Sequence, residues 1–312
     1  MPVRKPIVVV GSINMDLVAH AQRIPAVGET ILGTGFQTNP GGKGANQAVA
    51  VARLGYPVHM IGRVGTDAFG TELRTHLEST GVNTSSVIAT EGSSGVAVIV
   101  VSEKGENSIV VASGANAQVT PHDITSNLGL IQSAGMVLAQ LEIPLETVEF
   151  LASVCEKENV PFMLDPAPAR ELPPSLIQRV TWFTPNETEA AFYMNPGTPN
   201  AEPATIAEAL LKNGSSNVIL KRGSDGVYLA SSTGSHETLP AFSVKVIDTT
   251  AAGDAFNGGF AVAFMLDKSP KESVVFASAV AAISVTRAGA QSSMPSLEEV
   301  EAFLNSHESP SS

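Results

Sequence analysis

The apolar residues of the chain fall into two kinds of run that alternate along most of its length. Short runs rich in β-branched residues, beginning with Ile7–Val10, predict buried strands. Longer runs have helical spacing: in the first of them, Ala45–Leu54, apolar residues recur at i, i+3, i+4 and i+7, and Gly55 follows as a helix-ending residue. This alternation is typical of a parallel sheet that helices cover on both faces.

The same pattern predicts elements along the rest of the chain. Further strands are predicted at Val58–Ile61, Met136–Leu141, Phe162–Leu164, Thr181–Phe183, Val218–Leu220 and Val227–Ala230. Further helices are predicted at Gly70–Thr80, Leu145–Glu158, Thr188–Tyr193, Ala204–Leu211, Ala252–Phe264, Glu272–Val285 and Leu297–Leu304. No long change of composition divides the chain, so we expect a single domain over residues 1–312.

One stretch departs from the strand–helix alternation. Gly95–Val101 and Ser108–Ala112 flank a polar, glycine-containing connection, which predicts a β-hairpin. The run Val96–Val101 is apolar on both faces, whereas an exposed hairpin would alternate. Leu17–Phe36 can add a strand or two. We therefore expect a small β-sheet lid from about 17–40 and 94–112, with one face over a site and the other against a second lid in a homodimer.

Composition and charge narrow the classes of partner. Hydrophobic residues are 43% and charged residues 15% of the 312, which excludes a disordered chain, and no apolar run has the ~20 residues of a membrane span. The net charge of −12 repels nucleic acid and anionic lipid, so we expect neither as a partner. One cysteine forms no internal disulfide, and the apolar run Ile7–Val10 is too short for a signal peptide. We expect a cytoplasmic protein.

A glycine-rich cluster, Gly41–Gln47, opens the first long helix and allows a ligand to approach the backbone closely. It does not have the spacing of a P-loop, because Gln37 and Gly44 stand where GxxxxGK[ST] requires Gly and Ser or Thr. The GxGxxG fingerprint is also missing after the first strand, which removes the main support for nicotinamide chemistry. The alternative interpretation is a flexible turn into a helix, with Lys43 a solvated cation.

A second cluster, Asp248–Gly259, runs from a strand end into an apolar helix. A helix N-terminus built from small residues offers free N–H donors and a positive dipole end, which suit a phosphoryl group in transit. Asp254 would stand beside that group and could accept a hydroxyl proton, a step typically worth about 10²–10⁴ in rate. The alternative is an ordinary N-terminal helix carboxylate, worth about 0.3–1 kcal/mol to stability.

Taken together, the two clusters resemble the two signature regions of the ribokinase family of carbohydrate kinases. Further stretches resemble the same family along nearly the whole chain: Asn14–Asp16, Pro166–Pro173, Thr184–Ala190 and Thr286–Gln291. The resemblance implies an α/β fold, a three-layer α/β/α sandwich with a mainly parallel central sheet and a small β-sheet lid. It also implies ATP-dependent phosphorylation of D-ribose at the 5-hydroxyl.

The resemblance assigns residues to the sugar and to the transfer step. The residues that match the family's sugar ligands are Asn14, Asp16, Gly42, Lys43, Asn46 and Glu142. Carboxylates, amides and an ammonium suit the hydroxyls of a ribose, which both donate and accept hydrogen bonds. Asp254 matches the catalytic base, and the N–H groups of Ala251, Ala252, Gly253 and Asp254 would hold the developing negative charge.

The resemblance also assigns residues to ATP and to ions. The nucleotide set is Asn186, Glu189, Lys221, Gly223, Ser224, Gly226, Gly253 and Ser278, with Asn186 and Glu189 matching an NxxE motif associated with Mg²⁺ and phosphate. The chain departs from many relatives at Ser278, where they have His or Asn, and at Lys221, where some have Thr. An activating K⁺ would lie among Asp248, Thr250, Ser284, Arg287, Gly289 and Ser293, mostly through backbone carbonyls.

The residues leave some alternatives open. The runs Pro185–Glu187 and Lys221–Gly226 also fit an ordinary helix start and an ordinary hairpin turn. The same chemistry can act on deoxyribose, another small sugar or a nucleoside, because one hydroxyl separates ribose from 2-deoxyribose. A sugar-binding protein without catalysis is an alternative of another class, which the intact Gly253–Asp254 pair argues against.

Overall fold

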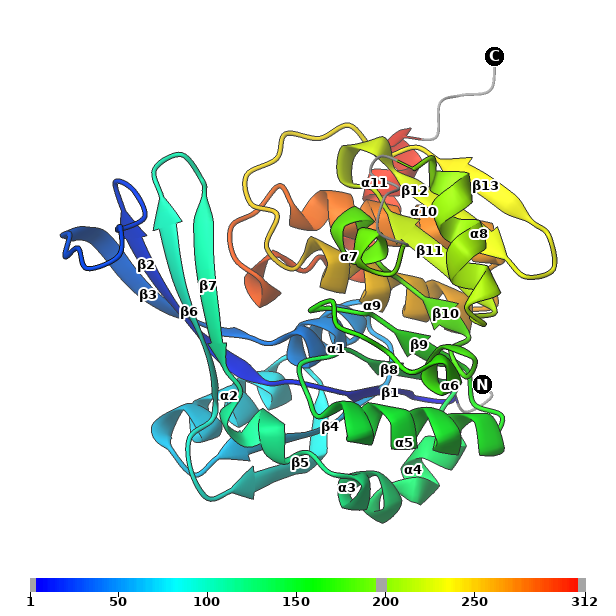
Figure 1. The fold of residues 1–312 in the computed structure, drawn as a ribbon, viewed down its shortest axis with the longest axis horizontal. Coiled ribbons are helices and arrows are strands. Elements are labelled where there is room, and N and C mark those ends of the chain that lie inside the picture. The colour runs from blue at the N-terminus through cyan, green and yellow to red at the C-terminus, as the bar shows by residue number, and fades with distance from the viewer. Residues whose placement is uncertain (1–3, 195–200, 308–312) are drawn as a thin grey trace.

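The computed structural model describes residues 4–194 and 201–307, and within them the main sheet has nine strands in the order β13-β12-β11-β10-β9-β8-β1-β4-β5 (Figure 1). The strands are β1 (Ile7–Val10), β4 (Val58–Gly65), β5 (Asn83–Thr90), β8 (Met136–Ala139), β9 (Phe162–Leu164), β10 (Trp182–Phe183), β11 (Asn217–Lys221), β12 (Val227–Ser231) and β13 (His236–Leu239). Neighbours from β5 to β11 pair in parallel, and only β12 and β13 join antiparallel. The expected mainly parallel sheet is confirmed.

Helices cover both faces of this sheet, as the three-layer prediction requires (Figure 1). One face carries α1 (Lys43–Arg53), α2 (Ala68–Ser79), α9 (Ala252–Met265), α10 (Pro270–Ser284) and α11 (Leu297–His307). The other carries α3 (Pro121–Ser126), α4 (Leu128–Ser133), α5 (Leu145–Lys157), α6 (Pro174–Ile177), α7 (Glu187–Phe192) and α8 (Pro203–Lys212). No helix of the described residues has the length and apolar character needed to cross a membrane.

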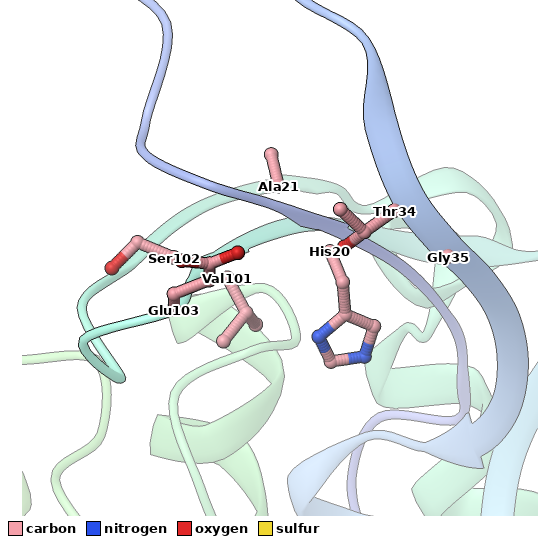
Figure 2. Close-up of a pocket in the computed structure, with 7 residues that line it drawn as sticks. All are labelled: His20, Ala21, Thr34, Gly35, Val101, Ser102 and Glu103. Atoms are coloured by element: carbon pink, nitrogen blue, oxygen red, sulfur yellow. The ribbon is translucent and has the colours of Figure 1, made fainter.

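A second, smaller sheet stands at one side of the main sheet (Figure 1). Its order is β3-β2-β6-β7, with β2 (Asn14–Ala21), β3 (Gly33–Gly41), β6 (Gly95–Ser102) and β7 (Asn107–Ala112). The antiparallel hairpin β6–β7 is confirmed. β2 starts three residues before the expected segment, because Asn14 already pairs with Gly41 and Gly95. The far end of this sheet bears a hollow of about 320 Å³ beside His20 and Glu103 (Figure 2).

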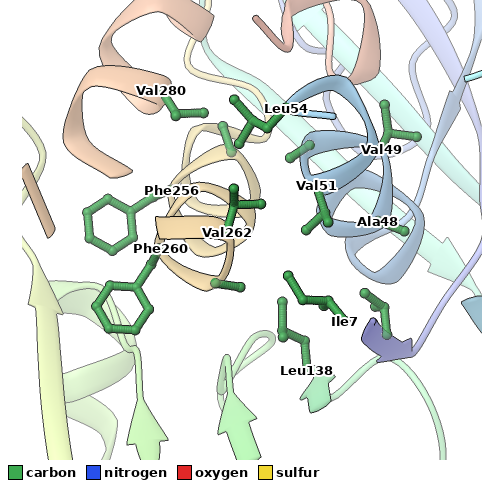
Figure 3. Packing of buried hydrophobic residues seen from close by; sticks show 14 of the residues in the cluster. Ile7, Ala48, Val49, Val51, Leu54, Leu138, Phe256, Phe260, Val262 and Val280 are labelled. Atoms are coloured by element: carbon green, nitrogen blue, oxygen red, sulfur yellow. The ribbon is translucent and has the colours of Figure 1, made fainter. Parts of the chain in front are cut away.

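Two hydrophobic cores lie on opposite faces of the main sheet. Ile7 of β1 belongs to the core under α1 and α9 (Figure 3), and so does Val9. Val8 and Val10 belong to the core under α5. The alternation follows from the two-residue repeat of a strand, and both faces must be apolar because both are covered. α1 and α9 cross closely: a Cβ on Gly258 would lie 2.6 Å from the Cβ of Ala50. This close crossing brings the start of α9 against the start of α1.

Some elements lie outside the sequence prediction. Strands β5 and β13, both at the edges of the main sheet, and the short helices α3, α4 and α6 were not predicted. An edge strand is covered less than a central one, so half of the residues in β5 are exposed and its sequence, NTSSVIAT, is polar. A helix of four to six residues is too short to show a period of 3.6.

Candidate active site

A cavity of about 670 Å³ opens where the strands of the main sheet end. Its walls come from the start of α1, the segment after β9, α7, β11 and its turn, the start of α9, and α10. Ligands of open α/β sheets bind at the carboxyl ends of the strands, because the loops and helix N-termini gather there. All of the residues predicted for the nucleotide line this cavity: Asn186, Glu189, Lys221, Gly223, Ser224, Gly226, Gly253 and Ser278.

The start of α9 forms one end of the cavity and has an unusual backbone. Ala251, just before the helix, has φ 57°, the left-handed conformation that residues with a Cβ rarely adopt and that clusters at functional sites. Gly253 and Asp254 donate their N–H groups to no acceptor among the described residues. The N–H of Ala252 donates to the carbonyl of Thr249 over 3.2 Å. The free donors therefore differ from the prediction at Ala252, because the turn before the helix uses that group internally.

Asp254 is held by two side-chain amides from the first turn of α1. Asn46 Nδ2 donates to Asp254 Oδ2 over 3.0 Å, and Gln47 Nε2 donates to Asp254 Oδ1 over 3.1 Å. Asp254 is only 4% exposed. Burial raises its pKa to about 6 and the charge of Asp165 adds to this rise, while Lys43 and the two amides oppose it. A carboxylate with a pKa near neutral and a fixed orientation is suited to general base catalysis.

The predicted sugar residues lie together between β2, α1 and the segment after β8. Glu142 Oε2 accepts hydrogen bonds from Asn14 Nδ2 over 3.5 Å, from the Lys43 backbone N–H over 3.2 Å and from Ser12 Oγ over 2.5 Å. Asp16 lies against Gly41, where a Cβ would approach Asp16 Oδ2 to 2.2 Å. Only glycine leaves room for the carboxylate there, which explains part of the Gly41–Gln47 cluster.

Charges in this region shift the pKa of their neighbours. Burial raises the pKa of Asp16 to about 7, and the carboxylates of Glu142 and Asp254 add to the rise. Burial opposes the charge on Lys43, but surrounding carboxylates, first Asp254 and then Asp165, outweigh it and raise the Lys43 pKa. The pocket therefore holds a cation among carboxylates, as expected for a site that orients several hydroxyls beside a phosphate.

Asn186 and Glu189 form a capping box at the start of α7. Asn186 Oδ1 accepts from the Glu189 N–H over 2.8 Å, and Glu189 Oε2 accepts from the Asn186 N–H over 2.8 Å. The ordinary helix start and the nucleotide assignment therefore coexist, because Glu189 also lines the cavity. Burial raises the Glu189 pKa, and Asp165 adds to the rise, against the attraction of Lys221.

The residues predicted for a monovalent cation lie on two segments that the fold brings together. Asp248 Oδ2 accepts from the Gly289 N–H over 2.8 Å, and Asp248 Oδ1 accepts from Thr250 Oγ1 over 2.6 Å. The Arg287 guanidinium pairs with Glu299 over 2.5 Å, and the hydroxyls of Ser284 and Ser293 bond to local carbonyls. The Arg287 side chain has no oxygen, so any contribution of Arg287 to a cation would come from its backbone carbonyl, whereas the hydroxyls of Ser284 and Ser293 keep free lone pairs.

Sequence reasoning missed several buried residues of the site. Asp165 directly follows β9, and its place after a strand of the parallel sheet was the available signal. Gln47 lies within the glycine-rich cluster but had no role assigned. Gln140, Gln291 and Asn116 complete the hydrogen bonding: Gln140 Nε2 donates to Gln47 over 2.7 Å, and Gln291 Nε2 donates to Asn46 over 3.1 Å. No local pattern marks these three residues.

Comparison with known proteins agrees with this geometry. The family model described as "pfkB family carbohydrate kinase" matches residues 4–297. The chain is 45% identical to the ribokinase of Bacillus subtilis, covering 96% of this chain and 99% of that protein, and 37% identical to the deoxyribokinase of Salmonella typhimurium, covering 97% and 99%. The structure of Arabidopsis thaliana ribokinase complexed with ribose and ATP matches with a TM-score of 0.90 and 35% identity over 97% of this chain and 99% of that one.

The fold, the site and these similarities lead to one assignment. The family model spans nearly the whole chain, and both signature clusters of the sequence meet at Asp254 in the structure. The chain belongs to the pfkB family of carbohydrate kinases.

Proposed function

We propose that the protein transfers the γ-phosphoryl group of ATP to the 5-hydroxyl of D-ribose, giving D-ribose 5-phosphate and ADP. The observation that carries this proposal is the position of Asp254. It lies in the wall of the cavity proposed for the nucleotide and accepts a hydrogen bond from Asn46, a residue of the proposed sugar set. A group that bridges both ligands is where a proton must leave the hydroxyl as phosphorus is attacked.

The residues of the chain divide the transfer step between them. The sugar hydroxyls are held by the six residues of the predicted sugar set: Asn14, Asp16, Gly42, Lys43, Asn46 and Glu142. The sugar oxygen bonds to the γ-phosphorus as the bond to the bridging oxygen of ADP breaks, and the hydroxyl proton passes to Asp254. The N–H groups of Gly253 and Asp254, at the positive end of α9, hold the charge that spreads over the phosphoryl oxygens.

We place ATP in the 670 Å³ cavity, with the phosphates toward Gly253 and the base toward Ser278. The lining of this cavity also includes the apolar residues Phe242, Val246 and Val285, which suit a planar base. The described residues hold no cluster of three or more metal-ligating side chains. Proteins bind Mg²⁺ through one or two carboxylates plus substrate phosphates, and Glu189 supplies a carboxylate in the cavity wall. Glu189 would hold it with Asn186 nearby, and the ion would neutralise phosphate charge.

We further propose a K⁺ site between the Asp248–Thr250 loop and the Ser284–Ser293 segment. The hydrogen bond from Gly289 to Asp248 joins the two segments directly before α9. An ion held there would order the turn at Ala251 without touching substrate. K⁺ suits a set of backbone carbonyls because it is a large, weakly hydrated cation, and such carbonyls need no charged side chain.

We propose that the small sheet is a lid over the sugar within a single kinase domain, and that it joins two chains in a homodimer. Asn14 and Asp16 of β2 lie on the same face as Ile109 and Val111 of β7, because directly paired residues share a face. Val98 and Val110 lie on the opposite face. Apolar side chains on both faces remain exposed in the single chain, which supports a covered partner surface.

The test is ADP production with a panel of sugars and nucleosides at equal concentration. We expect D-ribose to give the highest kcat/KM. The second candidate is a deoxyribose kinase, because a deoxyribokinase is among the relatives at 37% identity. A higher kcat/KM for 2-deoxyribose would establish it, and absence of ADP with every sugar would indicate a binding protein without catalysis. We propose a cytoplasmic location for the enzyme, since a single cysteine gives no reason to expect an oxidising compartment.

A further inference from the structure

An ion pair lies in the wall of the nucleotide cavity, one amide away from the proposed base. Lys221 Nζ of β11 lies 3.1 Å from Asp165 Oδ1, and their side chains are 13% and 4% exposed. Both residues line the 670 Å³ cavity. The ion pair is linked to the base through one amide: Gln47 Nε2 donates to Asp165 Oδ2 over 3.1 Å and to Asp254 Oδ1 over 3.1 Å.

The ammonium of Lys221 also lies beside the N-terminus of α9, which by itself disfavours a cation. A Cβ built on Gly253 would be 3.4 Å from Lys221 Nζ, so the ammonium stands against the first turn of α9. The N-terminus of a helix carries partial positive charge and attracts anions, not cations. Asp165 is the only side chain of the described residues that accepts a hydrogen bond from Nζ, which leaves donors of the –NH₃⁺ group directed elsewhere. An anion bound between Lys221 and α9 would accept hydrogen bonds from the ammonium and interact favourably with the positive end of the helix.

We propose that Lys221 is a catalytic residue that contacts the phosphoryl group during transfer, and that Asp165 and Gln47 are positioning residues that hold Lys221 in register with Asp254. The inference rests on the proposed kinase function, and it adds a cation to the N–H donors of α9. The donors of Lys221 would bond to the phosphoryl oxygens as the sugar oxygen attacks. The ion pair with Asp165 fixes the long side chain of Lys221 before the nucleotide binds, so that less rotamer freedom is lost on binding. Gln47 bonds to both Asp165 and Asp254 and so fixes the ion pair relative to the base.

The role of Lys221 is tested first by replacement with Met, which keeps the length of the stem and removes the charge. We expect kcat to fall about 10²–10³-fold, as for loss of one donor to a developing charge, with ribose affinity by calorimetry changed less than about twofold. Lys157→Met, at an exposed position of α5, is the matched control. A kcat within about threefold of wild type in Lys221→Met overturns the inference.

The roles of Asp165 and Gln47 are tested by kcat–pH profiles. The charged groups that act on Asp254 or interact with it are Lys43 on α1, Asp165 after β9 and Asp16 on β2. Glu142 after β8 and Glu189 on α7 act on Lys43, and Lys221 on β11 pairs with Asp165. Lys221→Met leaves the Asp165 charge uncompensated, so the acidic limb should move to higher pH. Asp165→Asn removes that charge, so the limb should move to lower pH. Gln47→Leu should lower kcat while ribose affinity is kept. Shifts in the same direction for the first two variants contradict the positioning role.

The double variant Asp165→Asn/Lys221→Met excludes a purely structural explanation, because it leaves no unpaired buried charge. If Asp165 acts through Lys221, the double variant should have a kcat within about threefold of Lys221→Met. Two outcomes overturn the inference. One is a loss of kcat in the double variant equal to the product of the losses in the two single variants, and the other is recovery of wild-type kcat in the double variant. An inactive wild type would remove the proposed function and the inference together, whereas an active wild type with an unimpaired Lys221→Met variant removes the inference alone.

Discussion

Asn116 Nδ2 donates a hydrogen bond of 2.6 Å to Asn14 Oδ1, across 102 residues of sequence. The backbone of Ile13 decides the orientation of both amides. The Ile13 N–H donates to Asn116 Oδ1 over 2.9 Å, and the Ile13 carbonyl accepts from Asn116 Nδ2 over 3.2 Å. Asn14 must therefore present its NH₂ group to Glu142 and to the sugar pocket, because its oxygen is already used.

This relationship predicts the effect of Asn116→Asp. The new carboxylate accepts from the Ile13 N–H, but its second oxygen faces two acceptors, so Asn14 must turn its amide or move. We expect the KM for ribose to rise about tenfold or more, since a buried polar mismatch costs about 1–3 kcal/mol. Steady-state kinetics measures this, with Asn305→Asp on the exposed side of α11 as the control. An unchanged KM would show that Asn116 does not orient Asn14.

Replacement of Asp16 by Asn and replacement of Asp254 by Asn should change different kinetic parameters. Asp16 is proposed to bind the sugar in ground and transition states alike, so Asp16→Asn should chiefly raise the KM for ribose. Asp254→Asn keeps the shape but cannot accept the proton, so kcat should fall by about 10²–10⁴ while ribose still binds. Kinetics beside calorimetric titration separates the two. If Asp254→Asn kept its kcat, Asp254 would be an N-terminal helix carboxylate and Asp16 the next candidate base.

The raised pKa of Asp16 predicts a pH dependence of stability. The folded chain keeps a proton on Asp16 up to about pH 7, whereas the unfolded chain releases it near its ordinary value of 3.8. The folded state binds more protons within this window, so the Asp16 contribution to the free energy of unfolding decreases as the pH rises through it. Asp16→Asn should therefore raise the Tm more at pH 8 than at pH 5. Equal increments at both pH values would contradict this, and the exposed Asp267→Asn serves as the control.

Self-association should depend on the apolar faces of the small sheet. Ile109 is 51% and Val110 is 67% exposed, and they lie on opposite faces of β7. Ile109→Asp places a charge on one face of the small sheet, and Val110→Asp places a charge on the other. We expect the variant whose face is buried between the two chains to dissociate the dimer. Sedimentation at micromolar concentration is the measurement. A native protein that sediments as a monomer would refute the proposed dimer.

Activity should depend on K⁺ if the Asp248 loop and the segment around Gly289 cradle the ion. We expect turnover to fall when K⁺ is replaced by tetramethylammonium at equal ionic strength, because the turn at Ala251 loses its support. Thr250→Ala removes a side-chain donor to Asp248 and should raise the K⁺ concentration needed for half-maximal rate. Equal rates in both buffers would argue against a cation site.

The sequence by itself determined which parts of the chain form the main elements. The four apolar residues of β1 and the helical repeat in α1 were visible because a covered strand is apolar on both faces and a helix repeats every 3.6 residues. Residues predicted for the sugar and the nucleotide lie in two short clusters and a few matching segments, so they too could be found along the chain. β5 was missed because its edge position leaves half of its residues exposed.

Only the tertiary structure decided which buried polar groups meet. Gln291 reaches Asn46 across 245 residues, Gln47 reaches Asp254 across 207, and Lys221 reaches Asp165 across 56. Periodicity reports whether a position is covered, but a hydrogen bond needs two groups within about 3 Å, and that distance follows from strand order and helix crossings. The close approach of α1 and α9 at Gly258 brings the amides to Asp254. No local pattern encodes such a partner, because each residue alone is only a polar side chain on an apolar helix or loop.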